Sequence, residues 1–150
     1  MTQIDFPLNP GGNEVNFIIE DVDFVLEKPN LIEDWVFRVV GREGMEINVI
    51  NFVFCSDEYL LAINRQFLSH DYLTDVISFP YNKNPIEGDI IISIDRVKDN
   101  AAEFGVSFPE ELHRVMIHGV LHFCGYKDKT KKEQKEMRIK ENEALAFFYS

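Results

Sequence analysis

The sequence feature that most constrains this chain is the run MEINVINFVF at residues 45–54, which is rich in β-branched and aromatic residues and partly alternates between apolar and polar positions. This composition favours a β-strand. We expect the run to be the second strand of a sheet and to lie at the centre of that sheet. A chain of 150 residues builds one hydrophobic core of ordinary size. The prediction is therefore a single domain, residues 1–150, that contains this strand.

The segments on either side alternate between strand-like and helix-like patterns. Further strands are predicted at residues 15–22, 75–81 and 89–94, the last two joined by the turn NKNPIEG as a hairpin. Helices are predicted to begin at Asn30, Ser56, Ser93, Ser107 and Thr130, with Gly41 ending the first and Gly105 the third. This order indicates an α+β domain with a mixed four-stranded sheet and about five helices. The order of the strands within the sheet is left open.

Composition and charge restrict the class of protein. Hydrophobic residues make up 45% and charged residues 27%, as in soluble globular domains. The first residues, MTQIDFPLNPGGNEV, lack the basic start and apolar run of a secretory signal, and no segment approaches the length of a membrane span. Cys55 and Cys124 stand far apart, which favours a reducing cytoplasm, and Cys124 is expected to be a small buried filler. The net charge of -11 argues against broad, non-specific binding to nucleic acid.

A cluster of positive charge departs from this acidic average. Two interpretations carry about equal weight: the solvated start of a helix, or a surface that steers phosphate groups toward an active site. The cluster consists of Lys127, Lys129, Lys131, Lys132 and Lys135.

The stretch HGVLHFCGYKD at residues 118–128 carries the clearest chemistry. On an α-helix, the spacing of His118 and His122 places both imidazoles on one face, roughly 6 Å apart along the axis. Gly125 is suited to the left-handed conformation that ends a helix and turns the chain back. Asp128 then offers a carboxylate as the third ligand of a metal ion. Three protein ligands leave a position open for water, as in catalytic rather than structural zinc sites.

This pattern is similar to the metzincin protease motif, His-Glu-x-x-His-x-x-Gly-x-x-His. It departs from that motif at Gly119, which stands where those proteases carry the glutamate that acts as general base. A peptidase of that kind is therefore disfavoured. A zincin-like site without this carboxylate either activates a water or polarises a substrate oxygen, which fits phosphodiester cleavage better than amide cleavage.

Together with HDYLTDVISFP at residues 70–80 and GDIIIS at residues 88–93, the histidine stretch resembles the YbeY family, described as metal-dependent endoribonucleases that mature ribosomal RNA. The resemblance implies that His118 and His122 bind one divalent ion per chain, with zinc expected and another divalent ion as the alternative. It also implies processing and quality control of ribosomal RNA, particularly that of the small subunit. The expected partners are ribosomal RNA and ribosomal proteins or the small ribosomal subunit, in the cytoplasm and without a membrane.

The chain departs from the family pattern at two positions. The third ligand in the family is a histidine, and this chain has Asp128 there, which we interpret as an exchange of one zinc ligand for another. Glu133 and Glu136 are next in line for that position. Many members carry an arginine at the position where this chain has Leu68. Arg65 lies about one helical turn earlier, and it is the candidate catalytic residue that would contact RNA instead of the missing arginine. An ordinary surface arginine is the alternative.

Polar residues of the segment between Leu68 and the next strand also match the family. Structural hydrogen bonds at the start of the strand are expected for Thr74 and Asp75, while a substrate-facing position is a hypothesis for Ser78. The matching residues are Asp71, Thr74, Asp75 and Ser78.

Three functions remain in competition. The leading one is a metal-dependent endoribonuclease in ribosomal RNA maturation and ribosome quality control. The alternative is a non-catalytic, metal-stabilised ribosome assembly factor, which the net charge of -11 favours because ribosomal proteins are usually basic. The third is a hydrolase of small phosphate esters or amides. The oligomeric state is left open.

Overall fold

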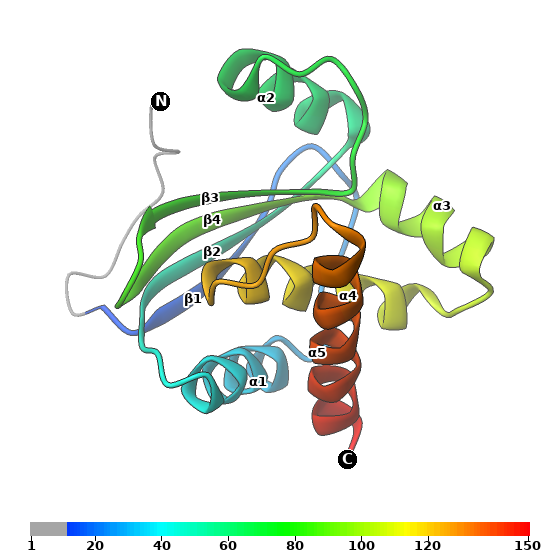
Figure 1. Ribbon diagram of the computed structural model, residues 1–150. Helices are drawn as coiled ribbons and strands as arrows, with labels where there is room; N and C mark the ends of the chain where they lie inside the picture. Colours follow the sequence, from blue (N-terminus) through cyan, green and yellow to red (C-terminus); the bar gives the residue numbers. More distant parts are fainter. Residues whose placement is uncertain (1–11) are drawn as a thin grey trace.

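The structure, a computed structural model, describes residues 12–150, so most of the N-terminal stretch examined for a secretory signal lies outside the described part. Four strands form one mixed sheet in the order β1-β2-β4-β3 (Figure 1). β1 (Glu14–Ile19) and β4 (Ile86–Ser93) both run parallel to β2 (Ile47–Cys55), which lies between them. β3 (Val76–Asn82) pairs with β4 in the antiparallel sense, as expected for a hairpin.

Five helices accompany the sheet in residues 12–150. Figure 1 shows α2 above one face of the sheet, with α1 and α4 below the other. The predicted α+β class, with a four-stranded mixed sheet and five helices, is confirmed. None of these helices combines the length and the apolar composition needed to cross a membrane. Their bounds are α1 (Pro29–Arg42), α2 (Asp57–Leu68), α3 (Ile94–Phe104), α4 (Phe108–Phe123) and α5 (Lys131–Tyr149).

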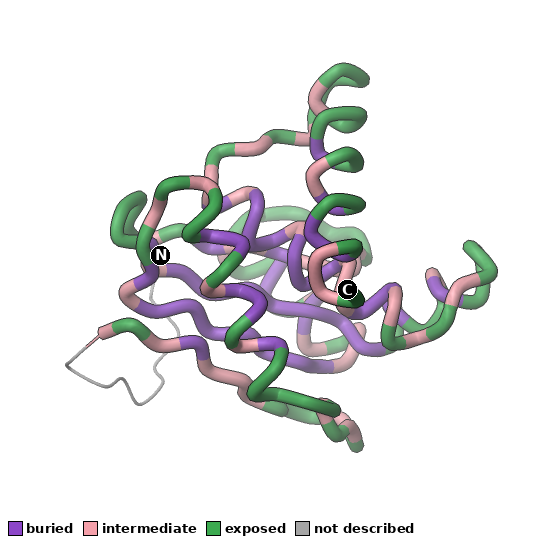
Figure 2. Tube along the Cα trace, turned by 90° about the horizontal axis from the view of Figure 1, so that it is seen from below, coloured by how far each residue is buried: buried purple, intermediate pink, exposed green. Residues whose placement is uncertain are grey.

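β2 is an interior strand, as predicted, and its side chains supply two hydrophobic clusters. Ile50, Phe52 and Phe54 point into the larger cluster, shared with α1 and α4, while Val53 and Cys55 point into the smaller one under α2. Figure 2 shows the buried residues gathered at the centre of the molecule. Burial of both faces explains why the run at 45–54 is apolar at most of its positions.

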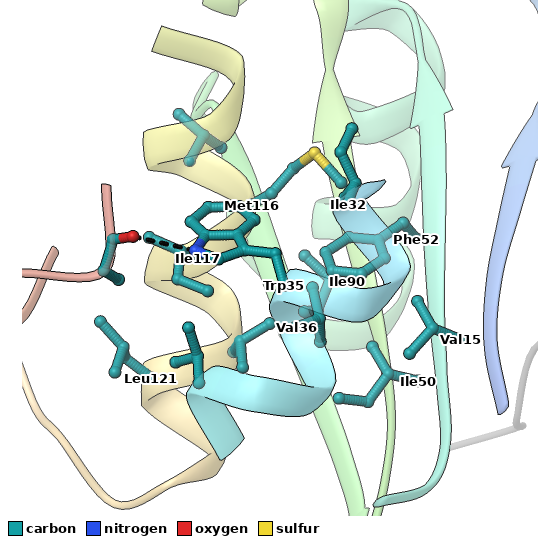
Figure 3. Packing of buried hydrophobic residues seen from close by; sticks show 14 of the residues in the cluster. Val15, Ile32, Trp35, Val36, Ile50, Phe52, Ile90, Met116, Ile117 and Leu121 are labelled. Carbon is teal, nitrogen blue, oxygen red and sulfur yellow. Dashed lines mark hydrogen bonds between the residues drawn. The ribbon is translucent and has the colours of Figure 1, made fainter. Parts of the chain in front are cut away.

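The larger cluster is organised around Trp35 of α1 (Figure 3). The Trp35 side chain is 1% exposed, and its ring lies 4.6 Å from that of Phe148, measured between centroids. Its indole Nε1 donates a hydrogen bond to the backbone carbonyl of Ala144 at 2.9 Å. A buried indole N–H needs such a partner, and this one ties α5 to α1.

The helix starts predicted from hydroxyl side chains are confirmed. In each, the hydroxyl oxygen accepts a hydrogen bond from a backbone N–H three residues later. At the start of α5 the Glu133 side chain also accepts from the backbone N–H of Thr130, which completes a capping box. Gly105 ends α3 with a φ of +67°, as predicted. The capping residues are Ser56, Ser93, Ser107 and Thr130.

α1 departs from the prediction at both ends. Its N-cap is Lys28, in a left-handed conformation with a φ of 54°, and Asn30 lies within the first turn. Pro29 begins the helix because a proline at the first position loses no hydrogen bond and already has a helical φ. Gly41 does not end the helix, and the left-handed position after it belongs to Gly44, with a φ of +74°.

Two strand boundaries differ from the prediction by three residues, and the other strand boundaries by one or two. β1 ends at Ile19 rather than residue 22, since Asp21 turns to accept hydrogen bonds from the backbone N–H and the hydroxyl of Ser56. β4 begins at Ile86, three residues before the predicted start at 89, because the first residues after the turn already pair with β2.

Candidate metal centre

The C-terminal end of α4 and the turn after it bring the predicted ligands together. His118 and His122 lie one turn apart on the same face of α4, with ring centroids 4.6 Å apart. α4 ends at Phe123, and Gly125, with a φ of +105°, turns the chain back as predicted. The turn brings Asp128 over the two imidazoles.

Three ligand atoms converge on one point. His118 Nε2 and His122 Nε2 are 3.0 Å apart, and Asp128 Oδ2 lies 3.2 Å from the first and 3.3 Å from the second. In a tetrahedral zinc site with bonds of roughly 2.0–2.2 Å, neighbouring ligand atoms are roughly 3.3–3.6 Å apart. The three atoms therefore need to move by only a few tenths of an ångström to hold an ion, and the donor set of two imidazoles and a carboxylate suits zinc.

Glu141 of α5 fixes the orientation of His118. Its Oε2 lies 2.7 Å from His118 Nδ1, so the carboxylate accepts the Nδ1–H and leaves Nε2 with a free lone pair for a metal. The Glu141 side chain is almost fully buried, and its other oxygen accepts hydrogen bonds from Arg114 at 3.1 Å and Arg138 at 3.4 Å. A carboxylate behind a ligating histidine is the usual second layer of zinc sites.

The same contacts set the direction of the pKa shifts. Burial alone would raise the pKa of Glu141, but the hydrogen bonds and charges of His118 and Arg114 outweigh it and lower that pKa. Burial alone would lower the pKa of His118, but Glu141, Asp128 and Asp75 together raise it. Burial and the neighbouring His118 lower the pKa of His122. Negative charge thus accumulates around the point where the ligand atoms meet, which favours a cation there.

Glu141 is not among the residues predicted from the sequence, although the sequence of α5 contains a signal for it. Met137, Glu141 and Leu145 follow one another at intervals of four in α5, and all three are buried. An acidic residue in the middle of an apolar helical stripe needs a partner inside the protein. What the sequence does not reveal is that the partner is His118, because α4 and α5 are joined by a turn of unknown direction.

The candidate metal centre lies in a cleft of about 560 Å³ between α4 and the segment that joins α2 to β3. Leu68, Thr74, Asp75, Ser78 and Lys129 are among the residues that line it, in addition to the three ligands. The carboxylate of Asp75 accepts a hydrogen bond from Asn100 Nδ2 at 3.2 Å, and burial raises its pKa. The structural hydrogen bond expected for Asp75 is therefore observed, whereas Ser78 lines the cleft and its contact with a substrate stays a prediction.

Arg65 is not among the residues that line the cleft. Its guanidinium pairs with Asp71, and both side chains are mostly exposed. Such an exposed pair contributes little to stability. The catalytic function of Arg65 therefore stays a prediction, without a position in the cleft to support it.

Gly119 allows α4 to approach the sheet closely. A Cβ atom at this position would lie 2.9 Å from Ile90 Cγ2 and 3.2 Å from the hydroxyl oxygen of Ser78. A glutamate in the place that metzincins use fits here only if the side chains of Ile90 and Ser78 give way. A glycine at position 119 thus matches the close packing of α4 on the sheet.

The lysine cluster is spread over the turn and the first turns of α5. All five lysines are exposed, and Lys129 is the one that lines the cleft. Glu133, the first alternative ligand, is engaged in the capping box of α5, and Glu136 is exposed. Neither belongs to the group of three that could hold a metal ion in residues 12–150.

The two cysteines occupy apolar surroundings. Cys55 is buried and Cys124 is half-buried against the larger core, which agrees with its expected function as a small filler. Burial raises the pKa of the Cys124 thiol to about 12. The thiol is therefore a poor candidate for a metal ligand.

A larger cavity of about 680 Å³ lies elsewhere, around the start of α1, the start of α4 and the end of α5. Its walls include the aromatic rings of Trp35, Phe108 and Phe148, together with His113. The ligands His118 and His122 do not line it. We therefore assign the chemistry to the smaller cleft.

Comparisons with known proteins identify the family of the chain. A family model described as "Endoribonuclease YbeY" matches residues 20–149. Curated proteins named Endoribonuclease YbeY include one from Flavobacterium psychrophilum, 52% identical over 86% of this chain and 93% of its own length. Another, from Christiangramia forsetii, is 49% identical over 91% of this chain and 95% of its own. A solution structure of a Thermotoga maritima protein is 27% identical, with a TM-score of 0.67 over 91% of this chain and 89% of the other.

Proposed function

Since the chain belongs to the YbeY family of endoribonucleases, we propose that it is a metal-dependent endoribonuclease that acts in ribosomal RNA maturation and ribosome quality control. The observation that carries the metal dependence is the convergence of His118 Nε2, His122 Nε2 and Asp128 Oδ2 within 3.3 Å of one another. We propose zinc as the ion, one per chain, because two imidazoles and a carboxylate form a donor set typical of catalytic zinc.

The protein's own residues prepare the cleft for phosphodiester cleavage. Glu141 holds the Nδ1–H of His118, which keeps Nε2 aimed at the cleft. Ser78 and Lys129 line the same cleft and offer a hydroxyl and a positive charge to a phosphate group. A divalent ion in such a site supplies charge stabilisation for a phosphoryl oxygen and acidifies a water molecule. Gly119 cannot supply the carboxylate that metzincins use as general base at this position, which disfavours peptide hydrolysis of that kind.

The proposed substrate is ribosomal RNA, in particular that of the small subunit, and the proposed partners are ribosomal proteins or the small ribosomal subunit in the cytoplasm. With a net charge of -11, this protein is repelled by bare phosphate chains and attracted to basic surfaces. Basic ribosomal proteins next to the RNA would offset that repulsion. Specific recruitment to ribosomal particles is therefore favoured over general degradation of RNA.

The test compares purified protein of defined metal content with a His118→Ala variant on structured ribosomal RNA. His113→Ala is the matched control, because His113 lies on the same helix but lines the other cavity. Cleavage by the wild type and His113→Ala, together with its loss in His118→Ala, is the expected result. Equal cleavage by all three would indicate a contaminating nuclease. Ribosome binding without any cleavage by the wild type would instead favour the metal-stabilised assembly factor.

A further inference from the structure

The segment between α2 and β3 presents an aromatic pair to the cleft. The candidate metal centre does not include this pair. The rings of His70 and Tyr72 stack with centroids 5.1 Å apart and planes 22° from parallel. The Tyr72 hydroxyl lies 3.0 Å from His70 Nδ1, so a hydrogen bond keeps the two rings together. Both side chains line the cleft that also contains His118 and Asp128.

Apolar surface is exposed around this pair. Tyr72 is 56% exposed, and its neighbours Leu73 and Leu68 are 45% and 38% exposed. These are three of the nine large hydrophobic side chains that are exposed in residues 12–150, and they fall within residues 68–73. Scattered exposed hydrophobic residues are ordinary, whereas a group of them beside a cleft indicates a binding surface.

The backbone beneath the pair is held in place by Asn64. Its side chain is buried, and Nδ2 donates a hydrogen bond to the carbonyl of Tyr72 at 2.9 Å. Its backbone carbonyl accepts from the N–H of His70 at 3.1 Å, across the left-handed turn at Ser69. The rings are thus exposed to solvent while their backbone is fixed, so a ligand that stacks on them pays little in lost conformational freedom.

We propose that His70 and Tyr72 form a stacking platform for one unpaired base of the RNA substrate, beside the phosphate that reaches the metal centre. The proposal rests on the proposed endoribonuclease function. Exposed aromatic rings are the usual means by which proteins hold bases of single-stranded RNA, since every base has a π-face. A base inside a duplex already has both faces covered, so the platform takes an unpaired base.

Charge also favours a contact to the base. The net charge of -11 gives RNA little general attraction to this protein, so stacking has to supply part of the affinity. Leu68 also supports this interpretation, because it lines the cleft with an apolar side chain that is 38% exposed. In this chain that wall of the cleft offers apolar contact to a base instead of a charge to a phosphate.

The test is steady-state cleavage of a short unstructured RNA by the metal-loaded, full-length protein. Tyr72→Ala should raise KM about tenfold or more, which corresponds to the loss of one stacked base. Tyr72→Phe, which keeps the ring, should lie closer to the wild type. Phe104→Ala is the matched control, since Phe104 is an aromatic residue with 58% exposure that does not line the cleft.

A series of substrates, each with one abasic nucleotide, then locates the base. At one position of the series, wild type and Tyr72→Ala should have the same KM, because the base that Tyr72 contacts is already missing. An unchanged KM of Tyr72→Ala on intact RNA would overturn the platform alone, as would a rise in KM that persists on every abasic substrate. Failure of the wild type to cleave any RNA would overturn the proposed function and the platform with it.

Discussion

Replacing Glu141 with glutamine should weaken zinc binding without unfolding the protein. Glu141 Oε2 accepts the Nδ1–H of His118 at 2.7 Å, and glutamine keeps an oxygen that accepts the same hydrogen bond but loses the negative charge. Charge-assisted hydrogen bonds are about twice as strong as neutral ones. The loss of such a second-layer partner typically weakens metal binding about 10- to 100-fold.

The magnitude differs between two substitutions. We expect Glu141→Gln to fall at the lower limit, about tenfold or about 1.4 kcal/mol, because the acceptor is retained. Glu141→Ala removes the acceptor and should approach about 100-fold, or about 2.7 kcal/mol. It also removes the carboxylate that pairs with Arg114, whose side chain is 19% exposed and keeps a hydrogen bond to Asn142 Oδ1, and this should cost about 1–3 kcal/mol of folding free energy. Arg138, at 58% exposure, can turn to water.

The assay is a zinc titration against a competing chelator, with thermal melting of the metal-free proteins recorded in parallel. Glu143→Gln is the control, because Glu143 lies on the same helix, is 56% exposed and pairs with Lys140 rather than with a ligand. Zinc affinities of Glu141→Gln and Glu141→Ala equal to that of the wild type would refute this account of the site. A loss of the same size in Glu143→Gln would show that only the overall charge matters.

Three further predictions follow from the site and its surroundings. Metal analysis should find about one divalent ion per chain. In a zinc titration, Asp128→Ala should bind zinc much more weakly than the wild type, whereas Asp128→His should retain binding. Tight binding by Asp128→Ala would exclude Asp128 as a ligand. Neutralising Lys129, Lys131 and Lys132 together should weaken RNA binding and flatten its salt dependence. An unchanged salt slope would mean that the lysine cluster is only the solvated start of a helix. Burial lowers the pKa of His113 from 6.5 to about 4, so its neutral form stabilises the fold fully above pH 6.5, and that stability is lost as the pH falls toward 4. From pH 7 to pH 5, the free energy of unfolding measured by urea titration should therefore fall more for the wild type than for His113→Gln. The extra fall should be about 1.4 kcal/mol per pH unit below pH 6.5, and equal falls would contradict it.

Local chemistry made much of the fold predictable. The hydroxyl caps at Ser56, Ser93, Ser107 and Thr130 act within three residues of themselves, so they are visible in the sequence and were placed correctly. The predicted start of α1 at Asn30 is wrong, because two local signals compete there. Pro29 at the first helical position outweighs a cap at Asn30. The strand order could not be predicted, since it depends on pairings between distant segments such as β1 and β2.

In the candidate site, too, the residues that are close in sequence could be predicted, whereas the contacts between distant segments could not. His118, His122 and Asp128 lie within one helix end and one turn, and their spacing was enough to predict that they converge. Glu141 comes from another helix, and its contact with His118 depends on how α4 and α5 pack. The stacked pair His70 and Tyr72 was also missed, because neither residue has a periodic pattern and their position at the cleft is set by buried Asn64.

The hydrogen bond from Trp35 to the carbonyl of Ala144 gives the protein a built-in spectroscopic probe. The chain contains one tryptophan, so its intrinsic indole emission comes from a single, buried environment. The indole donates its hydrogen bond to Ala144 of α5. The same helix carries Glu141, about one turn before Ala144. Detachment of α5 would expose the indole to water and shift its emission to longer wavelength. The fluorescence of the unlabelled protein therefore reports whether the helix behind the metal centre is docked.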